Sequence, residues 1–409
     1  MLAHKELPVR SDHATTWEEA RQLAYRCAVP LPSAATSLDM AVGCAVAQDV
    51  IARMDLPHYA SSAMDGWAIN GTGPWTVVRS GRRLSAGEAS VIATGGLIPA
   101  GATSVLRKES GRMDDGGLLT LLPDAKPGET VPGRHIRPAG EEATAGDNLI
   151  PAGTVLNPAH LALAAVAGHD NVLVQRKPGV AVLLTGSEVI TSGEPAPGQV
   201  RDAFGPQLNA VIPQLGGIAL GQTRIGDSYD EWLAALAGAG QRPDVTITTG
   251  GTGKSGTDHF RAAVEALGGR LLLDGVAMRP GHPAVMAELP DGRFIIGLPG
   301  NPLAAMLALM TLGEPLLAAL GNRPFRAATP MLSGADIEPV PGKTRLMPCS
   351  IVHGLVFPAS HTGPGMMRGL AWADGYMAVP PEGAAAGEPV PVLPLPWTTP
   401  GQPGEVRLG

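Results

Sequence analysis

The chain has 409 residues, so at roughly 150 residues per domain it is predicted to hold two to four domains. Hydrophobic residues make up 44% of the chain and charged residues 16%, which excludes an intrinsically disordered protein. The net charge of −7 argues against an extended phosphate-binding surface, so nucleic acid is not expected as a partner. The net charge does not exclude a local basic pocket for one small anion.

Three features predict a soluble, cytoplasmic protein. The cysteines, Cys27, Cys44 and Cys349, form no CxxC pair and fit neither a disulfide framework nor a structural zinc site. The N-terminal stretch MLAHKELPVRSDHATTWEEA lacks the apolar core of a signal peptide. The most apolar long stretch, 303–320, is interrupted by Gly-Glu-Pro at 313–315, so we expect no membrane span.

The N-terminal region, 1–176, is predicted to wrap around an inserted β lobe. Thr16 and Glu19 have the spacing of a capping box and open a short helix. From about 69 to 140, short apolar runs are broken by Gly, Pro and Asp, which indicates strands. Helical sequence returns after Asn157, which is predicted to be an N-cap followed by proline in the first turn.

Between 177 and 327 the pattern alternates between strand and helix, as in GVAVLLTG, GPQLNAVIPQLGG, GIALGQT, SYDEWLAALAGAG and DVTITTGG. This alternation is typical of βαβ units and predicts a doubly wound α/β domain with a parallel sheet. Ser228 and Glu231 have the spacing of a second capping box. Asn301 with Pro302 is predicted to begin the last helix of the domain.

The last region, 328–409, is predicted to be a small β domain. Its apolar runs are short, and it ends in GEPVPVLPLP, where proline is expected to restrict any strand to an edge position. The expected fold class is therefore a multidomain α/β and β protein. It combines an N-terminal mixed region with an inserted β lobe, a doubly wound parallel α/β domain and a small C-terminal β domain.

Three glycine-containing loops follow predicted strands of the α/β domain, at 185–188, 250–258 and 297–302. Because the carboxyl ends of parallel strands meet at one sheet edge, these loops are expected to offer backbone N–H groups to phosphate together. Such turns also occur in α/β folds without a ligand, and it is the three together that favour a site. GGTGKS lacks the first Gly of a Walker A loop, and no HExxH or GxSxG motif occurs.

Charged side chains gather at the same loops. Glu188, Asp227 and Asp258 fall at predicted loop positions, where carboxylates and ligand phosphates together suit Mg²⁺. Helix capping or pairing with the helix dipole is the alternative role for Asp227 and Asp258. The cations in or near these loops are Lys254, Arg279 and His282. Such cations could receive phosphate or remain solvated.

The chain resembles the MoeA family of molybdopterin molybdenumtransferases, to which the gephyrin E domain belongs. The matching stretches occur in family order over nearly the whole chain and read SSAMDGWA, TGGLIPAGATSVLRKE, IRPAGEEATAGDNLIPAG, RKPGVAVLLTGSE, DVTITTGG, MRPGHP and GLPGNP. The resemblance implies an elongated homodimer with a molybdopterin-binding α/β domain. It also implies a reaction in which adenylylated molybdopterin and molybdate yield molybdenum cofactor and AMP, with a divalent metal ion, usually Mg²⁺.

The resemblance further implies the residues of the site. Asp65, which alone would indicate only an Asp-Gly turn, is expected to be catalytic together with Glu188, Asp227 and Asp258, and the last three are expected to hold Mg²⁺. The residues expected to bind the pterin nucleotide are Thr94, Gly95, Arg137, Thr185, Gly186, Gly250, Gly251, Lys254, Arg279, Pro299, Gly300, Asn301 and Pro302. Asp65 and Glu188 are predicted to meet in one cleft, which a homodimer would form between its subunits.

Three places depart from the family pattern. Asp202-Ala203-Phe204 stands where the family has Asp, a hydroxyl residue and Asn, and Pro364 stands where it has Ser. In the loop at 250–258, Gly253 replaces a Ser, Ser255 replaces a Gly, and Lys254 adds a charge that the family does not require. Because these changes affect pterin contacts, a divergent, non-catalytic molybdopterin-binding or carrier module stays open as an alternative.

A third reading is adenylylation of the pterin, since other proteins share the α/β domain. It is the weakest, because the SAMDG stretch belongs to the molybdenum-inserting family. Retention of Asp65, Glu188, Asp227 and Asp258 favours the enzyme over a binding module, which has no evident need for this set of acids.

Overall fold

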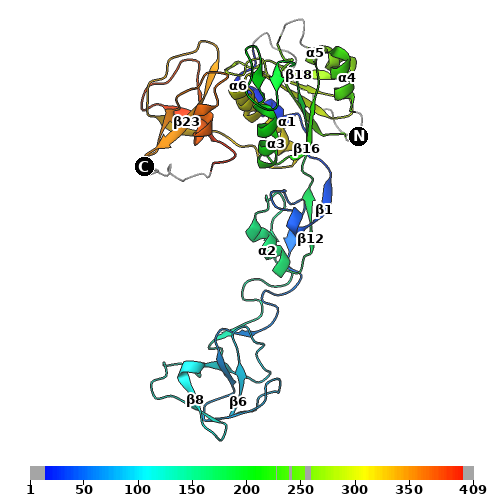
Figure 1. Cartoon of the computed structure of the whole chain (residues 1–409). Helices are drawn as coiled ribbons and strands as arrows, with labels where there is room; N and C mark the ends of the chain where they lie inside the picture. The colour runs from blue at the N-terminus through cyan, green and yellow to red at the C-terminus, as the bar shows by residue number, and fades with distance from the viewer. Residues whose placement is uncertain (1–13, 227, 239–241, 254–258, 399–409) are drawn as a thin grey trace. The chain divides into compact units, whose positions relative to one another are not determined.

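The computed structural model describes residues 14–226, 228–238, 242–253 and 259–398. The chain forms two compact units (Figure 1). The lobe unit is Ala35–Val174, and the sheet unit takes Met1–Ala34 and Gln175–Gly409. The lobe unit is therefore an insertion between the first helix of the sheet unit and the rest of that unit.

The sheet unit is built on a six-stranded sheet with the order β16-β13-β17-β21-β20-β18. Its strands are β13 (Gly179–Leu184), β16 (Ile218–Arg224), β17 (Val245–Thr249), β18 (Arg270–Asp274), β20 (Val285–Glu288) and β21 (Phe294–Leu298). The first four strands in this order are parallel, as the alternating pattern predicted. At the other edge, β20 pairs antiparallel with β21, and β18 pairs antiparallel with β20. The link 289–293 is too short for a crossover helix, so β20 and β21 form a hairpin.

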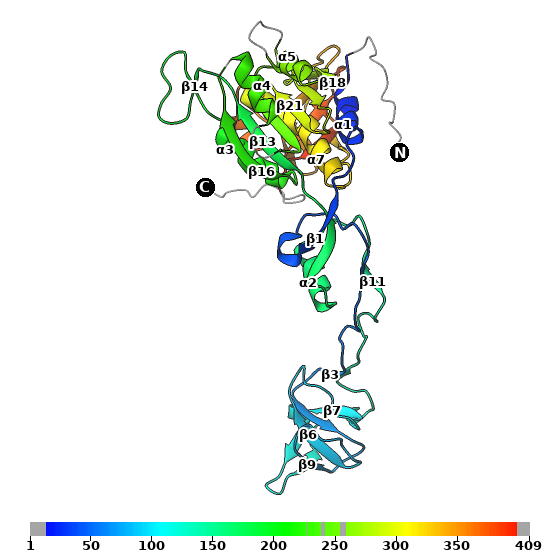
Figure 2. The ribbon, with the colours of Figure 1, turned by 90° about the vertical axis from the view of Figure 1, so that its right-hand side faces the viewer.

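Helices cover both faces of this sheet (Figure 2), as in a doubly wound fold. They are α1 (Trp17–Arg26), α3 (Phe204–Gln214), α4 (Tyr229–Ala237), α5 (Phe260–Ala266), α6 (Pro302–Ala308) and α7 (Glu314–Leu320). Successive residues of β13 enter different cores. Val182 joins the cluster of α1, α3, α6 and α7, whereas Leu183 joins Trp232 of α4 and Phe260 of α5. The strand is therefore buried on both faces, as expected for a parallel sheet.

The apolar stretch noted in the sequence is a core helix. α6, a π-helical turn (Leu309–Gly313) and α7 run on as one helix, Pro302–Leu320. By length and composition this helix could cross a membrane, but 94% of its apolar window is buried inside the protein. α1 packs against it, and Trp17 Nε1 donates to Thr311 Oγ1 at 3.1 Å. The helix thus forms the centre of the larger core of the sheet unit.

The C-terminal β domain is a closed sheet, which confirms the predicted small β domain. Its elements are β22 (Thr329–Ser333), β23 (Thr344–Val352), β24 (Leu355–Pro358), α8 (Arg368–Ala371), β25 (Gly375–Val379) and β26 (Pro389–Pro394), joined by β19 (Met278–Arg279). The order is β19-β23-β24-β22-β26-β25, and a further pairing of β25 with β23 closes the ring. Because β19 pairs with β23, the loop that follows β18 is tied to this barrel.

The expectation that proline confines β26 to an edge is wrong. β26 pairs with β22 through Pro389–Val392 and with β25 through Val392–Pro394. The two pairings overlap only at Val392. Each proline therefore lies where the strand is paired on one side only, so a missing N–H breaks no ladder on the other side.

The lobe unit ends in a six-stranded sheet with the order β7-β4-β6-β5-β9-β8, which confirms the predicted β lobe. Its elements are β4 (Gly66–Ile69), β5 (Trp75–Val77), β6 (Glu88–Ile92), β7 (Ser104–Arg107), the 3₁₀ turn η2 (Lys108–Ser110), β8 (Gly111–Met113) and β9 (Leu118–Leu121). Trp75, Ile69, Leu106 and Leu119 fill its core.

The chain enters and leaves this lobe through a ladder of paired strands. β1 (Ser33–Ser37) pairs with β12 (Asn171–Gln175), β2 (Val50–Ile51) with β11 (Asn148–Ile150), and β3 (Ser61–Ser62) with β10 (Ile136–Arg137). The 3₁₀ turn η1 (Leu38–Met40) and α2 (Pro158–Val166) pack beside this ladder. The nested pairing shows that the outgoing and returning segments run side by side, as expected for an inserted lobe.

The predicted helix starts are confirmed, whereas one of the two predicted capping boxes is not. Thr16 and Asn157 each accept a bond from the helix that they open. Ser228 precedes α4 but makes no side-chain bond to it, and the Glu231 carboxylate accepts the N–H of Gly226 instead. The capping box predicted for Ser228 and Glu231 is therefore wrong, because Glu231 binds the loop ahead of the helix.

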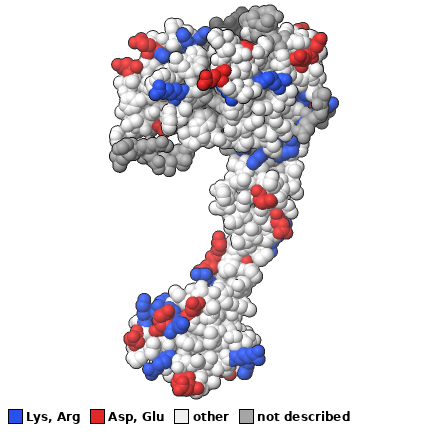
Figure 3. Space-filling model, in the orientation of Figure 1, with Lys and Arg blue, Asp and Glu red and all other residues white. Residues whose placement is uncertain are grey.

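Charges are mixed on the face of the molecule that Figure 3 shows. On the face drawn in Figure 3, basic and acidic side chains lie among each other in the sheet unit and in the lobe unit. This face carries no extended basic surface on its described residues, in keeping with the negative net charge of the chain.

Candidate functional site

The sheet unit holds a cavity of about 790 Å³ at the carboxyl ends of β17 and β21. The loop after β17 and the loop after β21 form one side of it, the segment around β19 forms another, and the barrel contributes the rest. Its lining includes Gly250, Gly251, Thr252, Gly253, Arg279, His282, Pro299, Gly300, Asn301, Lys343 and Pro364. Six residues predicted to bind the pterin nucleotide thus meet here: Gly250, Gly251, Arg279, Pro299, Gly300 and Asn301.

Backbone contacts tie the three predicted loops together at this edge. Thr185 Oγ1, after β13, donates to the carbonyl of Thr249. The N–H of Gly250 donates to the carbonyl of Leu298 at 2.9 Å. Gly250 has φ +82°, and a Cβ on it would lie 2.9 Å from Thr185 Oγ1, so only glycine fits this close approach. The expectation that these loops share one sheet edge is therefore confirmed for their described residues.

The loop after β21 opens toward the cavity. Pro299 is buried, but Gly300 and Asn301 are exposed, and no atom lies within 4 Å of the position that a Cβ would take on Gly300. Asn301 is the N-cap of α6, with Pro302 at the first helical position, yet its side chain makes no capping bond. The Pro364 carbonyl accepts the N–H of Ala304 at 3.1 Å instead. The Asn301 amide is thus left at the cavity wall.

Among its described lining residues the cavity has cations and no carboxylate. Arg279 and Lys343 form no ion pair with any described residue, and Arg279 lies in register with Arg345 on the neighbouring strand β23. His282 Nδ1 is 2.7 Å from the carbonyl of Val276, so Nδ1 carries the proton that it donates there, and Nε2 makes no hydrogen bond with a described residue. This excess of positive charge suits an anionic ligand.

Lys343 is a residue that the sequence did not single out. It lies before β23 in the barrel, far along the chain from the loops that it faces. The only signal was its place in Pro-Gly-Lys, which by itself indicates a turn.

The lobe unit carries the other predicted residues. Asp65 is exposed, and its Oδ1 accepts two bonds from Thr94, from the backbone N–H at 2.7 Å and from Oγ1 at 2.8 Å. These two bonds, the backbone one first, lower the pKa of Asp65, so the carboxylate is charged at neutral pH. Gly95 and Arg137 are also exposed in this unit. Asp65 and Thr94 are therefore brought together, whereas the predicted meeting of Asp65 with Glu188 of the sheet unit stays a prediction.

The predicted metal ligands are only partly described. Glu188 is exposed in the loop between β13 and β14 (Val189–Ile190), which pairs with β15 (Val200–Arg201). Its carboxylate folds over Gly186, where a Cβ would lie 2.9 Å from Glu188 Oε2. The other proposed metal ligands, and two residues of the loop after β17, lie outside the described residues: Asp227, Asp258, Lys254 and Ser255. No group of three His, Cys, Asp or Glu side chains that could hold a metal ion occurs in the described ranges.

The departure at 202–204 lies beside a second cavity, of about 520 Å³, between β13, β16 and α3. Asp202 Oδ1 accepts the N–H groups of Phe204 and Gly205 at 2.9 and 3.0 Å, and its Oδ2 accepts from Arg224 at 2.7 Å. Phe204 packs against the larger core. The aspartate therefore starts α3, and the phenylalanine that replaces a polar residue is partly buried against the core.

Three family models match successive parts of the chain. Residues 15–168 match the MoeA N-terminal region (domains I and II). Residues 181–319 match a probable molybdopterin binding domain, and residues 332–395 match the MoeA C-terminal region (domain IV).

Individual relatives agree with this. Molybdopterin molybdenumtransferase 2 of Mycobacterium tuberculosis is 30% identical over 377 residues, which are 84% of this chain and 90% of that protein. Molybdopterin molybdenumtransferase of Nostoc sp. is 30% identical over 68% of this chain and 67% of its own length. A crystal structure of the molybdopterin biosynthesis MoeA protein from Pyrococcus horikosii matches 93% of this chain and 99% of its own, with 25% identity and a TM-score of 0.73. The chain therefore belongs to the MoeA family of molybdopterin molybdenumtransferases.

Proposed function

We propose that this protein is a molybdopterin molybdenumtransferase: it inserts molybdate into adenylylated molybdopterin, yields molybdenum cofactor and releases AMP. Family membership supports this reaction. The observation that carries it is the cationic cavity of about 790 Å³, where glycine loops of the sheet edge face Arg279 and Lys343 without a described carboxylate. Such a cavity suits phosphate and molybdate, because both are anions that need donors and positive charge.

Each part of the proposed site has a physical role. Arg279 and Lys343 are positioned to offset negative charge on the phosphates, and charge of this kind is most useful on a leaving group that develops more of it. Backbone N–H groups of the glycine loops, apart from that of Gly250, which is bonded to Leu298, would add donors that need no rearrangement. Asp65 is held ionised by Thr94, so in the lobe unit it would act as a fixed acceptor rather than as a proton donor.

Mg²⁺ is part of the proposal, with Glu188, Asp227 and Asp258 as its carboxylate ligands. When bound, the ion would polarise a phosphate oxygen of the substrate. Only Glu188 of the three is among the described residues, so the support is the choice of oxygen ligands, which Mg²⁺ prefers. We also propose a homodimer, a cytoplasmic location, and domain boundaries near residues 177 and 328.

The test is an assay of AMP. Purified protein is mixed with adenylylated molybdopterin, with and without molybdate, and AMP is quantified by chromatography. We expect AMP release that depends on molybdate and falls by at least about tenfold in Arg279→Ala. Arg270→Ala is the matched control, because Arg270 is an exposed arginine of β18 paired with Glu288 and does not line the cavity.

The same assay separates the alternatives. Tight binding of the nucleotide without AMP release would show a carrier module. Formation of adenylylated molybdopterin from molybdopterin and ATP would show the adenylylating activity. A protein that shows no nucleotide binding and no turnover would contradict the proposal.

A further inference from the structure

We propose that Glu129 is a positioning residue of the lobe unit: its buried carboxylate joins Arg107 to His135 and so holds in register the two backbone segments that carry Asp65 and Arg137. This inference rests on the proposed function, in which Asp65 and Arg137 serve the reaction. It concerns residues that the sequence pattern did not indicate.

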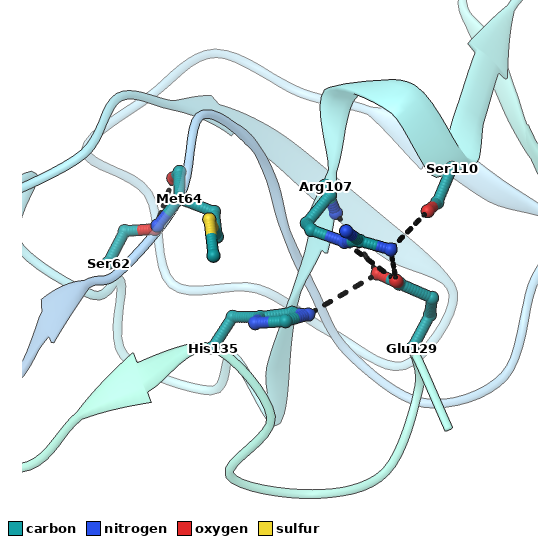
Figure 4. Close-up of polar contacts among 6 residues, drawn as sticks. All are labelled: Ser62, Met64, Arg107, Ser110, Glu129 and His135. Carbon is teal, nitrogen blue, oxygen red and sulfur yellow. Dashed lines mark hydrogen bonds and ion pairs between the residues drawn. The ribbon is translucent and has the colours of Figure 1, made fainter. Parts of the chain in front are cut away.

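Glu129 is the centre of a side-chain cluster in the lobe (Figure 4). It is 2% exposed, and its Oε1 accepts from Arg107 Nε at 2.8 Å and from Arg107 Nη2. Its Oε2 lies 3.4 Å from the Arg107 backbone N–H and 3.6 Å from His135 Nε2. Arg107 also reaches Ser110 Oγ at 3.4 Å. One carboxylate thus contacts both β7 and the turn before β10.

The segments that this carboxylate joins are those of the predicted site residues. Arg107 lies opposite Gly66 in the β4–β7 pairing, and the next residue, Lys108, donates its N–H to the Asp65 carbonyl at 2.9 Å. The His135 carbonyl accepts the Ala63 N–H at 2.9 Å. Both partners of Glu129 are therefore paired with backbone next to Asp65: Arg107 with Gly66, and His135 with Ala63.

His135 also leads directly into the strand that carries Arg137. In β10, Ile136 lies opposite Ser62 and Arg137 lies opposite Ser61 of β3. The Arg134 carbonyl accepts the N–H of Val105 at 3.0 Å, so the turn is fixed to β7 as well. A shift of this turn would move Arg137 and the Asp65 segment together.

Packing alone does not require a charge at position 129. A buried ion pair is often no more stabilising than apolar side chains of similar volume, so a carboxylate with several partners favours a role in geometry. His135 holds φ +59°, a left-handed conformation that is uncommon outside glycine, and its buried Nε2 has no hydrogen-bond partner among the described residues. Its nearest carboxylate oxygen belongs to Glu129.

The charge states fit this arrangement. Burial raises the pKa of Glu129, but the bonds from Arg107 outweigh it and hold the pKa below its usual value. Burial lowers the pKa of His135, the charge of Glu129 opposes this, and Arg134 and Arg107 add to the lowering. At neutral pH the cluster is therefore a charged Arg107–Glu129 pair beside a neutral imidazole.

The test uses three variants. Glu129→Gln keeps the shape of the side chain and removes its charge. His135→Asn removes the imidazole but keeps a residue that tolerates positive φ. His353→Asn is the matched control. It is the same substitution at another histidine with positive φ, +50°, in the exposed turn between β23 and β24 of the sheet unit. Each is measured by thermal unfolding, by hydrogen exchange and by molybdate-dependent AMP release, alone and combined with Arg137→Ala.

We expect Glu129→Gln to speed exchange of the Ala63 and Lys108 amides about tenfold and to lower kcat/KM about tenfold, with a smaller effect in His135→Asn and none in His353→Asn. Because Glu129 is expected to act partly through the segment of Arg137, its effect on kcat/KM should be smaller in the Arg137→Ala background than in the wild type.

Unchanged exchange at both amides would overturn the inference. Faster amide exchange in Glu129→Gln with full AMP release would also overturn the inference. So would a loss of kcat/KM from Glu129→Gln that is as large in the Arg137→Ala background as in the wild type. In either case Glu129 would be merely structural. If Glu129→Gln does not fold, the same outcomes apply to His135→Asn. A wild type that releases no AMP would overturn the proposed function and this role with it, whereas normal wild-type turnover with an unaffected variant overturns the inference alone.

Discussion

The two groups of proposed site residues, one in the sheet unit and one in the lobe unit, are built in different ways. In the sheet unit, the cavity is walled by loops that follow parallel strands, and its shape comes from backbone and glycine. In the lobe unit, Asp65 depends on side-chain bonds to Thr94, a residue 29 positions away. The first kind of site follows from the fold, since the four parallel strands of this sheet end at the same edge. The second depends on a few contacts between segments that are distant in sequence.

This difference predicts different sensitivity to substitution. Replacing a charged side chain at the open cavity of the sheet unit should weaken ligand binding but hardly change the free energy of unfolding. The lobe should lose structure and function together when one of its close approaches or side-chain bonds is broken. The following experiments are ordered from the largest expected effect to the smallest.

Gly66→Ala should have the largest effect. Gly66 has φ +153°, and a Cβ on it would lie 2.0 Å from the carbonyl oxygen of Leu106, which is backbone and cannot move aside. We expect the lobe to lose about 3 kcal/mol or more of unfolding free energy. Gly71→Ala is the control, since Gly71 has φ +76° with no atom within 4 Å of the new Cβ, and should lose roughly 1–2 kcal/mol. Urea unfolding followed by tryptophan fluorescence measures both, and equal losses would show that the close approach is unimportant.

The next effect is on binding in the sheet unit. Arg279→Ala combined with Lys343→Ala should weaken binding of adenylylated molybdopterin by at least about a hundredfold, since charge-assisted hydrogen bonds contribute about 1.5–3 kcal/mol each. The loss should be greater at low salt, and the unfolding midpoint should stay unchanged. Calorimetric titration at two salt concentrations measures this, with Arg270→Ala as control. Wild-type affinity in the double variant would mean that the cavity is not the anion site.

A smaller effect is expected for Thr94→Val, which removes the hydroxyl bond to Asp65 and keeps the stronger backbone bond. Because both bonds lower the pKa of Asp65, the pKa should rise toward its usual value of 3.8. The acidic limb of the pH profile of AMP release should then move to higher pH, and kcat/KM should fall by about threefold. Thr76→Val, at an exposed threonine of β5, should leave the profile in place. If the acidic limb does not move in Thr94→Val, the limb does not report the ionisation of Asp65.

The smallest effect concerns the pH dependence of lobe stability. The pKa of His135 is lowered in the folded protein, mainly by burial, so the unfolded chain binds more protons as the pH falls below the usual value of 6.5. The wild type should therefore lose stability between pH 7.5 and 5.5, above the range in which Glu129 titrates. His135→Asn should lose less over the same interval, as measured by urea midpoints. If the urea midpoint changes equally with pH in the wild type and in His135→Asn, a group other than His135 is responsible.

The comparison also explains what the sequence could predict. Local patterns were enough for β13, β16 and β17, for the caps at Thr16 and Asn157, and for the meeting of the glycine loops. They failed where a partner is supplied by tertiary structure. The antiparallel edge of the sheet and the two-sided pairing of β26 depend on neighbouring strands that no window of sequence contains.

The site residues divide in the same way. Gly250 and Gly300 could be found because glycine after a buried strand is itself a signal. Glu129 lies 22 residues from Arg107 in a segment rich in glycine and proline, and Lys343 lies in a turn of the barrel. Neither residue has a local pattern that indicates a ligand or a buried ion pair, so only the fold reveals them.

The most direct test of the account asks whether the lobe unit and the sheet unit serve one reaction. Asp65→Asn, Glu188→Gln and the double variant are compared in single-turnover release of AMP from adenylylated molybdopterin with molybdate present. We expect each single variant to lose at least about a hundredfold in rate, and the double variant to be no slower than the slower single, because both acids act on the same chemical step. A single variant with the wild-type rate, or two losses that simply multiply, would contradict a shared site.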